Sequence, residues 1–598
     1  MSGTTLTWRL LRDLRPTALE GAGDAWHEVS GRSGSDRVRV DRLMTARLRE
    51  TQESRSAAAA LVRLQRLSRN YQYLHTECGL IRTTLNALAA DLAVPQRQLR
   101  QALDEAAELR FTVHEDGSVS FPAATTATLA GEISTPGGHV RGDARLPLDQ
   151  APGLSGPPPT VKPLNPNAEK AQAIADRIAR AVSEAADIDR TYAETLDRLK
   201  AAKGLDVTAA TLADAARDTA GVRAAAGRHL GGGIPADRSP AELKAWWDGL
   251  PEEQRREYID VAPDLIGGLD GLPAAVRDEA NRNHLPVLID ELARRHDDDS
   301  RTKLEALRLI QDRLTEPSVP PMYLLGIGDE GNGRAIVAYG NPDTSRNVSA
   351  YVPGLGTKLN GEFVEDTMKR AEDTAIGARR VDPSSASIIW LGYDAPQFGD
   401  VMTDGDARRG APAYNQFMAG LEATNTNHDP HLTAIGHSYG SYTVGTAAKQ
   451  SGGIPGVDDV ILLGSPGVGV EKAGDLGVAA NHVFVGAADN DLVTRAPTKG
   501  EMAFGGPVGS LFYGDVVDRG NDDNYFGKDP ASEAFGAQRF KVDPGPPFAG
   551  VSASEGMRLG LMDAHSQYFD PTLDAESASN IARIVGGRPD KITTEEWR

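Results

Sequence analysis

The sequence predicts an α/β fold in which a doubly wound, mostly parallel sheet follows a largely α-helical N-terminal half. From Pro321 onward, short apolar or β-branched runs alternate with helical segments, the pattern of strands joined by crossover helices. Before that point, apolar residues recur at spacings of three and four, which is the period of helices. The expected strands are residues 322–329, 333–340, 347–354, 386–394, 432–438, 459–467 and 482–489.

Length and charge narrow the classes of protein to consider. A chain of 598 residues exceeds what a single core can serve, so several domains are expected. The net charge of −20 argues against nucleic acid or an anionic membrane as the main partner. We expect no transmembrane segment, because no run of about eighteen apolar residues occurs. The N-terminus lacks the features of a signal peptide, so the expected compartment is the cytoplasm.

Residues 1–115 are expected to form a helical hairpin-like domain. Their apolar residues alternate at spacings of four and three, as in a heptad seam between packed helices. Cys78, the one cysteine of the chain, lies on this seam, which favours a small buried hydrophobe over a reactive thiol and excludes an internal disulfide. The seam consists of Ala60, Leu64, Leu67, Tyr71, Leu74, Cys78, Ile81, Leu85 and Leu88.

Residues 116–166 are predicted to be a Pro/Gly-rich linker with a short hairpin at its start. The hairpin is expected over 111–122, with its turn at Asp116-Gly117. From residue 123, Pro, Gly, Thr and Ala dominate, and such a composition buries too little apolar area to offset the entropy of ordering.

A second helical region is predicted over 167–317. Asn165 or Asn167 is its expected N-cap. Trp246 and Trp247 are expected to anchor a compact run of short helices further along. The first helix carries a second seam at the same spacing, formed by Ala171, Ile174, Ile178, Ala181, Ala185, Ile188, Tyr192, Thr195 and Leu199.

The most informative stretch of the third part, 318–598, is the pentapeptide GHSYG at residues 436–440. An apolar strand precedes it, and small residues suited to a helix follow. G-x-S-x-G between a strand and a helix is the pattern of a nucleophile elbow, in which a sharp turn exposes the serine hydroxyl. Ser438 is therefore the predicted nucleophile of an α/β-hydrolase fold, whereas the turn directs His437 elsewhere, as a packing residue.

A serine nucleophile needs a base, and the base needs an acid that orients it. In this fold class the acid and then the histidine follow the serine. His482 immediately precedes a strand, away from the strand ends where such sites are built, so His565 is the predicted base. The acid is expected just past the strand that follows His482, where Asp491 is preferred and Asp489 is the alternative.

Two backbone N–H groups are expected to stabilise the oxyanion. One belongs to Tyr439, and the other to Leu355 or its neighbour Gly354, in the glycine-rich loop after the third strand. This loop lacks the spacing of phosphate-binding loops, so no nucleotide and no other cofactor is expected.

Loops on either side of these motifs are expected to line the pocket. One is residues 396–412, and the other lies between the acid and the base. Asp400, Asp404 and Asp406 in the first loop lack a clear ligand geometry, which favours a solvated loop, and no metal site is predicted.

Five motifs, in order, resemble the actinobacterial α/β-hydrolase family filed as domain of unknown function 1023. They are VPGLGT, WLGYDAP, GHSYGS, the Asp-Leu-Val turn and HSQYFDP, and the upstream helical segment APDLIGGLDGLPAAVRDEANR is similar too. The resemblance covers roughly 245–571 and implies a triad of Ser438, Asp491 and His565. The N-terminal hairpin is similar in style to small helical proteins exported by type VII secretion, but it lacks a clear Trp-x-Gly turn.

The sequence thus predicts a serine hydrolase of the esterase or lipase type. Its substrate would be a small-molecule or lipid carboxylic ester, cleaved through an acyl-Ser438 intermediate. A peptidase or amidase is an alternative, because the same triad cleaves amides. The alternative from another class is a non-catalytic interaction or secretion-associated protein that uses the fold as a scaffold. The helical N-terminal half would pack on the hydrolase domain or bind a protein partner.

Overall fold

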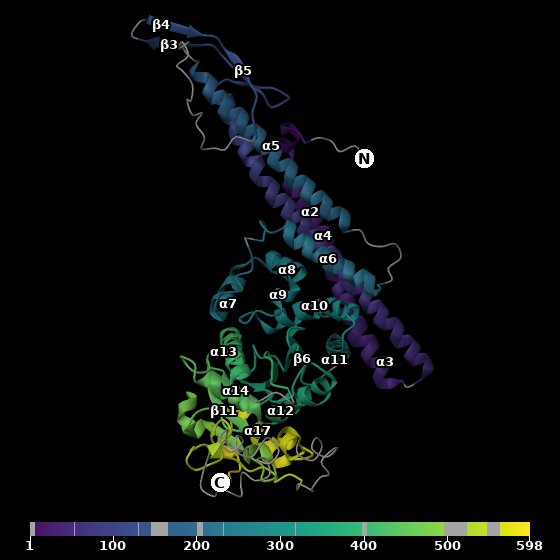
Figure 1. Cartoon of the computed structure of the whole chain (residues 1–598). Coiled ribbons are helices and arrows are strands. Elements are labelled where there is room, and N and C mark those ends of the chain that lie inside the picture. The colour runs from purple at the N-terminus through teal and green to yellow at the C-terminus, as the bar shows by residue number, and fades with distance from the viewer. Residues whose placement is uncertain are drawn as a thin grey trace. The chain divides into compact units, whose positions relative to one another are not determined.

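The computed structural model describes residues 6–52, 54–128, 131–144, 165–199, 207–230, 233–316, 318–397, 403–495, 523–546 and 563–598. The chain forms two compact units (Figure 1). Unit 1 comprises residues 1–37 and 69–233, and unit 2 comprises residues 38–68 and 234–598. The helical region predicted over 167–317 is therefore divided between the units. The other predicted segment boundaries remain predictions.

Helices of six to 54 residues form most of the described N-terminal part. They are α1 (Trp8–Asp13), α2 (Pro16–Arg39), η1 (Val40–Thr45), α3 (Ala46–Thr51), α4 (Arg55–Glu108), α5 (Pro166–Arg198) and α6 (Ala209–Ala225). The predicted seam on α5 is confirmed, because all nine of its residues are buried. The N-cap of α5 is Asn165, whose side chain accepts a hydrogen bond from the N–H of Asn167.

The predicted seam on α4 is only partly confirmed. Cys78 and Leu88 are buried as expected, but Leu67 is 38% exposed. Polar residues outside the seam, among them Glu77 and Arg82, are buried instead. The reason is that α4 packs on more than one side within unit 1: Gly23 of α2, Tyr192 of α5 and Ala215 of α6 all lie against it.

Within the predicted linker, residues 124–128, 131–135 and 138–140 form strands, which the prediction did not include. The expected hairpin is present as β1 (Thr112–Val113) and β2 (Val119–Phe121), with Gly117 at a φ of 79°. Backbone hydrogen bonds then add β5 (Gly138–Val140) to β2 and pair β3 (Ala124–Thr128) with β4 (Gly131–Thr135). Strand pairing satisfies backbone groups without apolar side chains, which is why composition missed it. Residues 145–164 of the predicted linker lie outside the described part.

Unit 2 contains an eight-stranded sheet in the order β15-β12-β11-β10-β8-β9-β7-β6. All pairs are parallel except those of β7 with β6 and β9. The predicted fold class is confirmed. The strands are β6 (Met322–Gly328), β7 (Arg334–Tyr339), β8 (Asn347–Val352), β9 (Ser385–Leu391), β10 (His431–His437), β11 (Val457–Leu463), β12 (Val483–Gly486) and β15 (Gln538–Arg539). The two-residue β15 was not predicted from the sequence.

Helices cover both faces of this sheet, so its strands are apolar on both sides. Along β11, Val460 and Leu462 join the core formed with α13 (Gly405–Thr424) and α14 (Tyr439–Ala448). Ile461 and Leu463 join the core formed with α12 (Met368–Val381) and α17 (Ala575–Val585). The shorter elements are η2 (Phe363–Thr367), η3 (Ala473–Leu476), η4 (Ala480–His482), η5 (Leu492–Arg495), β13 (Asp523–Asn524), β14 (Gly527–Lys528), α16 (Asp563–Ser566), η6 (Gln567–Phe569) and η7 (Pro589–Lys591).

Five helices of unit 2 lie between residues 240 and 315, directly before the sheet. They are α7 (Pro240–Gly249), α8 (Glu252–Val261), α9 (Pro263–Ile266), α10 (Ala274–Arg294) and α11 (Asp298–Thr315). α10 covers the edge strand β6, since Asp278 accepts from the N–H of Leu324 at 2.7 Å and Asn281 donates to its carbonyl at 3.0 Å. Of the two predicted anchors, Trp247 is buried and Trp246 is half-buried. Within the described residues, no helix is both long and apolar enough to cross a membrane.

Candidate active site

Ser438 occupies a strained turn between β10 and α14. Its φ of 57° makes it one of two non-glycine residues with a positive φ in the described chain. The glycines of the motif are required by close approach: a Cβ at Gly436 would lie 2.5 Å from the Cα of Ser441, and a Cβ at Gly440 would lie 2.1 Å from the carbonyl oxygen of Val352. This is the geometry of a nucleophile elbow.

The structure brings His565 and Asp491 together. His565 Nδ1 lies 2.8 Å from Asp491 Oδ2, and both residues are fully buried. Asp489, the alternative acid, has a side chain that is 61% exposed and lies near the guanidinium groups of Arg539 and Arg598, at 3.6 and 3.8 Å. Of the two carboxylates, Asp491 is therefore the one that can orient His565.

Asp491 is surrounded by donors. Its Oδ2 also accepts from the hydroxyl of Tyr568 at 2.6 Å, and its Oδ1 accepts from the N–H of Val493 at 2.9 Å. Burial by itself raises the pKa of the Asp491 carboxyl, but attraction to His565 and these hydrogen bonds outweigh burial and hold the pKa below its usual value. Asp491 is therefore an anion at neutral pH.

Tyr568 was not among the residues predicted from the sequence. It lies three residues after His565, on the continuous turn of α16 and η6. Residues three apart share one face of a helical turn, so the His-x-x-Tyr spacing in HSQYF was the signal that could have found it.

His437 has a larger role than packing. It is buried, its ring lies 4.5 Å from that of His565 between centroids, and its Nε2 is 2.7 Å from the carbonyl oxygen of His565. A carbonyl can only accept, so His437 carries its proton on Nε2. Burial, and then the charges of His565 and Arg370, lower the pKa of His437 far below its ordinary value, so the ring stays neutral. The residue before the serine thus ties β10 to the segment that carries His565.

Ser438 and His565 both lie against the end of β11. The N–H of Ser438 donates to the carbonyl of Leu463 at 2.9 Å, and a Cβ on the next residue, Gly464, would lie 2.7 Å from His565 Nδ1. His565 Nε2 is buried and has no hydrogen-bond partner among the described residues, so its bond to the hydroxyl of Ser438 is not formed here. In enzymes without bound substrate, such bonds are often long and shorten only in the complex.

The predicted oxyanion loop lies beside the elbow. A Cβ at Gly354 would lie 2.6 Å from the Cβ of Ser438 and 2.9 Å from the backbone nitrogen of Tyr439. The loop is anchored by Tyr393, whose hydroxyl donates to the carbonyl of Pro353, and by the N–H of Gly356, which donates to Pro396. Among the hydrogen bonds of the described residues, none has the N–H of Tyr439 or Leu355 as its donor. Both N–H groups can therefore serve a ligand.

The structure also describes several residues that the sequence weighed and set aside. His482 is the last residue of η4, just before β12, and its Nδ1 lies 2.7 Å from Asp459 Oδ1, at the opposite ends of the strands from Ser438. Asp404 and Asp406 were expected in a loop over 396–412, but α13 begins at Gly405, so Asp404 is its N-cap residue and Asp406 lies in its first turn. They form ion pairs with Arg408 and Arg409. Asp400 lies outside the described residues, as does most of the segment between acid and base. No group of three or more metal-ligating side chains occurs in the described ranges.

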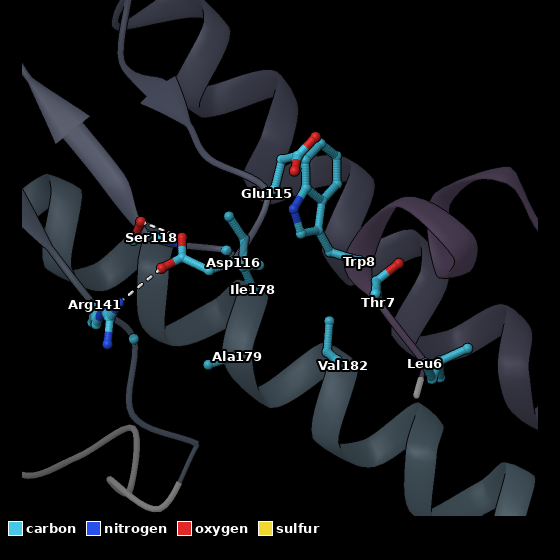
Figure 2. A pocket seen from close by; sticks show the side chains of 12 residues that line it. Leu6, Thr7, Trp8, Glu115, Asp116, Ser118, Arg141, Ile178, Ala179 and Val182 are labelled. Carbon is cyan, nitrogen blue, oxygen red and sulfur yellow. Dashed lines mark hydrogen bonds and ion pairs between the residues drawn. The ribbon is translucent and has the colours of Figure 1, made fainter. Parts of the chain in front are cut away.

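Unit 1 contains a pocket of about 360 Å³ that the sequence did not predict. Trp8 of α1, the turn between β1 and β2, and α5 line it (Figure 2). Asp116 accepts from Ser118 and pairs with Arg141 at 3.2 Å, and Glu115 pairs with Arg9 at 3.0 Å. Its carboxylates are thus already paired, so we assign no chemistry to this pocket.

Comparison with known proteins agrees with the fold of unit 2. Residues 329–500 match the family described as alpha/beta hydrolase, a range that includes Ser438 and Asp491 and ends before His565. Uncharacterized protein Rv2079 of Mycobacterium tuberculosis is 28% identical over 405 residues, which cover 60% of this chain and 58% of that protein. This chain therefore spans little more than half the length of that relative.

Shorter relatives match more closely. Uncharacterized protein Rv0963c of Mycobacterium tuberculosis and Uncharacterized protein Mb0988c of Mycobacterium bovis are each 38% identical over 202 residues, which cover 32% of this chain and 75% of theirs. The names of these relatives state no activity. The identity and coverage show that this chain belongs to the same family as these mycobacterial proteins, with an alpha/beta hydrolase domain in its C-terminal half.

Proposed function

We propose that this protein is a serine hydrolase that cleaves carboxylic esters, with Ser438 as nucleophile, His565 as general base and Asp491 as the acid that orients the base. One observation carries the proposal: a buried 2.8 Å hydrogen bond joins His565 and Asp491 beside a serine held at a φ of 57°. A histidine oriented by a buried carboxylate is the arrangement that activates a serine hydroxyl.

The proposed reaction has two halves. Ser438 Oγ attacks the ester carbonyl while its proton moves to His565 Nε2, and the tetrahedral intermediate then expels the alcohol, which takes that proton. Water next attacks the acyl-serine with His565 again as the base, so that the acid is released and Ser438 regains its proton. Asp491 remains an anion throughout and stabilises the imidazolium.

In this proposal the oxyanion is held by the N–H groups of Tyr439 and Leu355. The close approach of Gly354 to Ser438 supports it, because a side chain there would separate the loop from the elbow. Each such donor contributes about two to three orders of magnitude to kcat.

The substrate class in this proposal is a small-molecule or lipid ester, and the helical N-terminal half is proposed to bind a protein partner. The charge of −20 supports a partner other than nucleic acid.

One observation favours the scaffold alternative, a non-catalytic protein with this fold. His565 Nε2 and the hydroxyl of Ser438 are not hydrogen-bonded to each other. The two proposals differ in whether Ser438 reacts with an electrophile that requires an activated serine.

A fluorophosphonate probe separates them. We expect the wild type to be labelled on Ser438, as located by peptide mass spectrometry, and Ser438→Ala and His565→Ala to remain unlabelled. His482→Ala is the matched control, because His482 also follows the serine but pairs with Asp459 instead. If the folded wild type is not labelled, the hydrolase proposal fails and the scaffold role stands.

A further inference from the structure

Tyr568 and His565 converge on one oxygen of Asp491. Asp491 Oδ2 lies 2.8 Å from His565 Nδ1 and 2.6 Å from the Tyr568 hydroxyl. Both side chains come from the same helical turn, three residues apart, while Asp491 follows β12. One helical turn therefore carries both the proposed base, His565, and a second hydrogen-bond donor, Tyr568, to Asp491.

The direction of the Tyr568 hydroxyl is determined by its surroundings. The N–H of Ala488 donates to the phenol oxygen at 3.0 Å, so the phenol proton is left to point at Asp491. Tyr568 is fully buried. Burial, and then the charge of Asp491, raise the pKa of Tyr568 well above its ordinary value, so the group remains a donor across the working pH range.

We infer that Tyr568 is a positioning residue of the proposed triad, whose hydroxyl holds Asp491 in place and weakens the attraction of Asp491 for the proton on His565. The inference rests on the proposed function, because the triad itself is proposed. Tyr568 contacts neither Ser438 nor the reacting atoms in this scheme, and it acts through Asp491.

The sign of its effect follows from the charge on Asp491. A donor to a carboxylate stabilises the anion and makes it a weaker base. Without the Tyr568 hydroxyl, Asp491 would hold an imidazolium more tightly, so His565 would lose its proton only at higher pH. The other groups that face this pair are His437 from β10, Arg370 from α12 and Arg598, whose guanidinium bonds the carbonyls of Ala487 and Ala488. None of these groups is altered by a change at Tyr568.

The test compares Tyr568→Phe with Tyr414→Phe. Tyr414 is the matched control, because it is equally buried and donates to a carbonyl, that of Ala350, at 3.0 Å. The measurement is the rate of fluorophosphonate labelling of the full chain as a function of pH. In the pH–rate profile, the acid limb is the range in which the labelling rate falls as the pH decreases. In Tyr568→Phe we expect this limb to move to higher pH by about one unit. At pH values below the limb, labelling should then be about tenfold slower than in the wild type. Tyr414→Phe should leave the limb in place, and an unmoved limb in Tyr568→Phe would overturn the inference even if the plateau rate fell.

A second variant moves the limb in the opposite direction. Fluorotyrosine incorporated at position 568 retains the ring and donates a stronger hydrogen bond, so the acid limb should shift to lower pH. This variant decides the question if Tyr568→Phe does not fold, because no oxygen is removed. A limb that fails to move, or moves upward, contradicts the inference.

A titration that needs no activity separates this inference from the proposed function. Histidines labelled with ¹³C at Cε1 are followed by NMR against pH in the wild type and Tyr568→Phe, with the His565 resonance identified by its loss in His565→Gln. If the wild type is not labelled by the phosphonate, the proposed function fails, while a higher titration midpoint for His565 in Tyr568→Phe still supports the inference. Equal midpoints in the two proteins refute it.

Discussion

Two buried carboxylates, one in each unit, respond to burial in opposite ways. Asp491 of unit 2 is 0% exposed, and Glu77 of unit 1 is 4% exposed. Asp491 accepts hydrogen bonds from three residues, whereas neither carboxylate oxygen of Glu77 has a partner among the described residues. Burial, and then the charges of Asp218 and Asp214, raise the pKa of Glu77 to about 8, while the pKa of Asp491 stays below its usual value.

The two carboxyls differ in what opposes burial: the charge of His565 and the donated hydrogen bonds outweigh it at Asp491, whereas the charges around Glu77 add to it. The backbone after β12 and the turn of α16 and η6 supply the donors to Asp491. Around Glu77 the neighbours on α6 are themselves acidic, and the buried Arg82 leaves its Nε and Nη1 without partners in the described chain. Unpaired buried polar groups cost stability. Unit 2 thus retains an anion where the proposed chemistry needs one, and unit 1 carries a protonated acid.

Removing the charge of Asp491 should have the largest effect. Asp491→Asn retains the shape but presents a neutral amide to His565, which disfavours both the reactive tautomer and the imidazolium. We expect kcat/KM for an ester to fall about 10⁴-fold. Asp489→Asn is the matched control and should leave kcat/KM within a few-fold of the wild type, because that side chain is largely exposed. Equal losses in the two variants would contradict the assignment of the acid.

Displacing the hydrogen bond between His565 and Asp491, with both side chains kept, should lower kcat/KM less. A Cβ at Gly464 would lie 2.7 Å from His565 Nδ1 and 2.8 Å from Asp491 Oδ2. Gly464→Ala should therefore displace the hydrogen bond and lower kcat/KM about 100-fold.

Gly453→Ala controls for backbone strain alone. Both glycines have a positive φ, of 53° and 73°, but nothing lies within 4 Å of a Cβ at Gly453. Gly453→Ala should cost stability in thermal unfolding and leave kcat/KM unchanged. If Gly464→Ala and Gly453→Ala had comparable kcat/KM values, the contact between a Cβ at position 464 and the His565–Asp491 pair would not matter for activity.

The smallest effect is expected in unit 1, and on stability alone. The pKa of folded Glu77 is raised from 4.5 to about 8, so its contribution to stability is present below pH 4.5 and is lost as the pH rises through about 8. At pH 8.5, Glu77→Leu should be more stable than the wild type by about 1–3 kcal/mol, and the difference should shrink toward pH 5. Ester hydrolysis should be unaffected.

Cys78 supplies the measurement. It is the one cysteine of the chain, lies next to Glu77, and has a pKa that burial, and then Glu77, raise to about 11. Its thiol should therefore react with alkylating reagents only when unit 1 opens. Pulse alkylation along a urea series, for wild type and variant at each pH, gives the free energy of unfolding of this unit. A wild type whose stability is independent of pH between 5 and 8.5 would contradict the account of Glu77.

Local patterns were sufficient to predict much of unit 2. Seven of the eight strands, the elbow at Ser438 and the second seam on α5 follow from periodicity and turn chemistry, which depend on neighbouring residues. The preference for His565 over His482 also came from position along the chain relative to the strands. The sequence by itself therefore determined the fold class and the candidate residues.

The tertiary structure decided what depends on contacts between distant segments. Asp491, and not Asp489, pairs with His565, which lies 74 positions further along the chain. The hydrogen bond from Tyr568 to Asp491 spans 77 positions, and the one from His437 to the carbonyl of His565 spans 128. The burial of Glu77, the strands β3, β4 and β5 and the short β15 likewise depend on partners elsewhere in the chain. Periodicity records which face of an element is apolar. It does not record which polar groups meet once those faces are packed, because that depends on the three-dimensional arrangement of the elements.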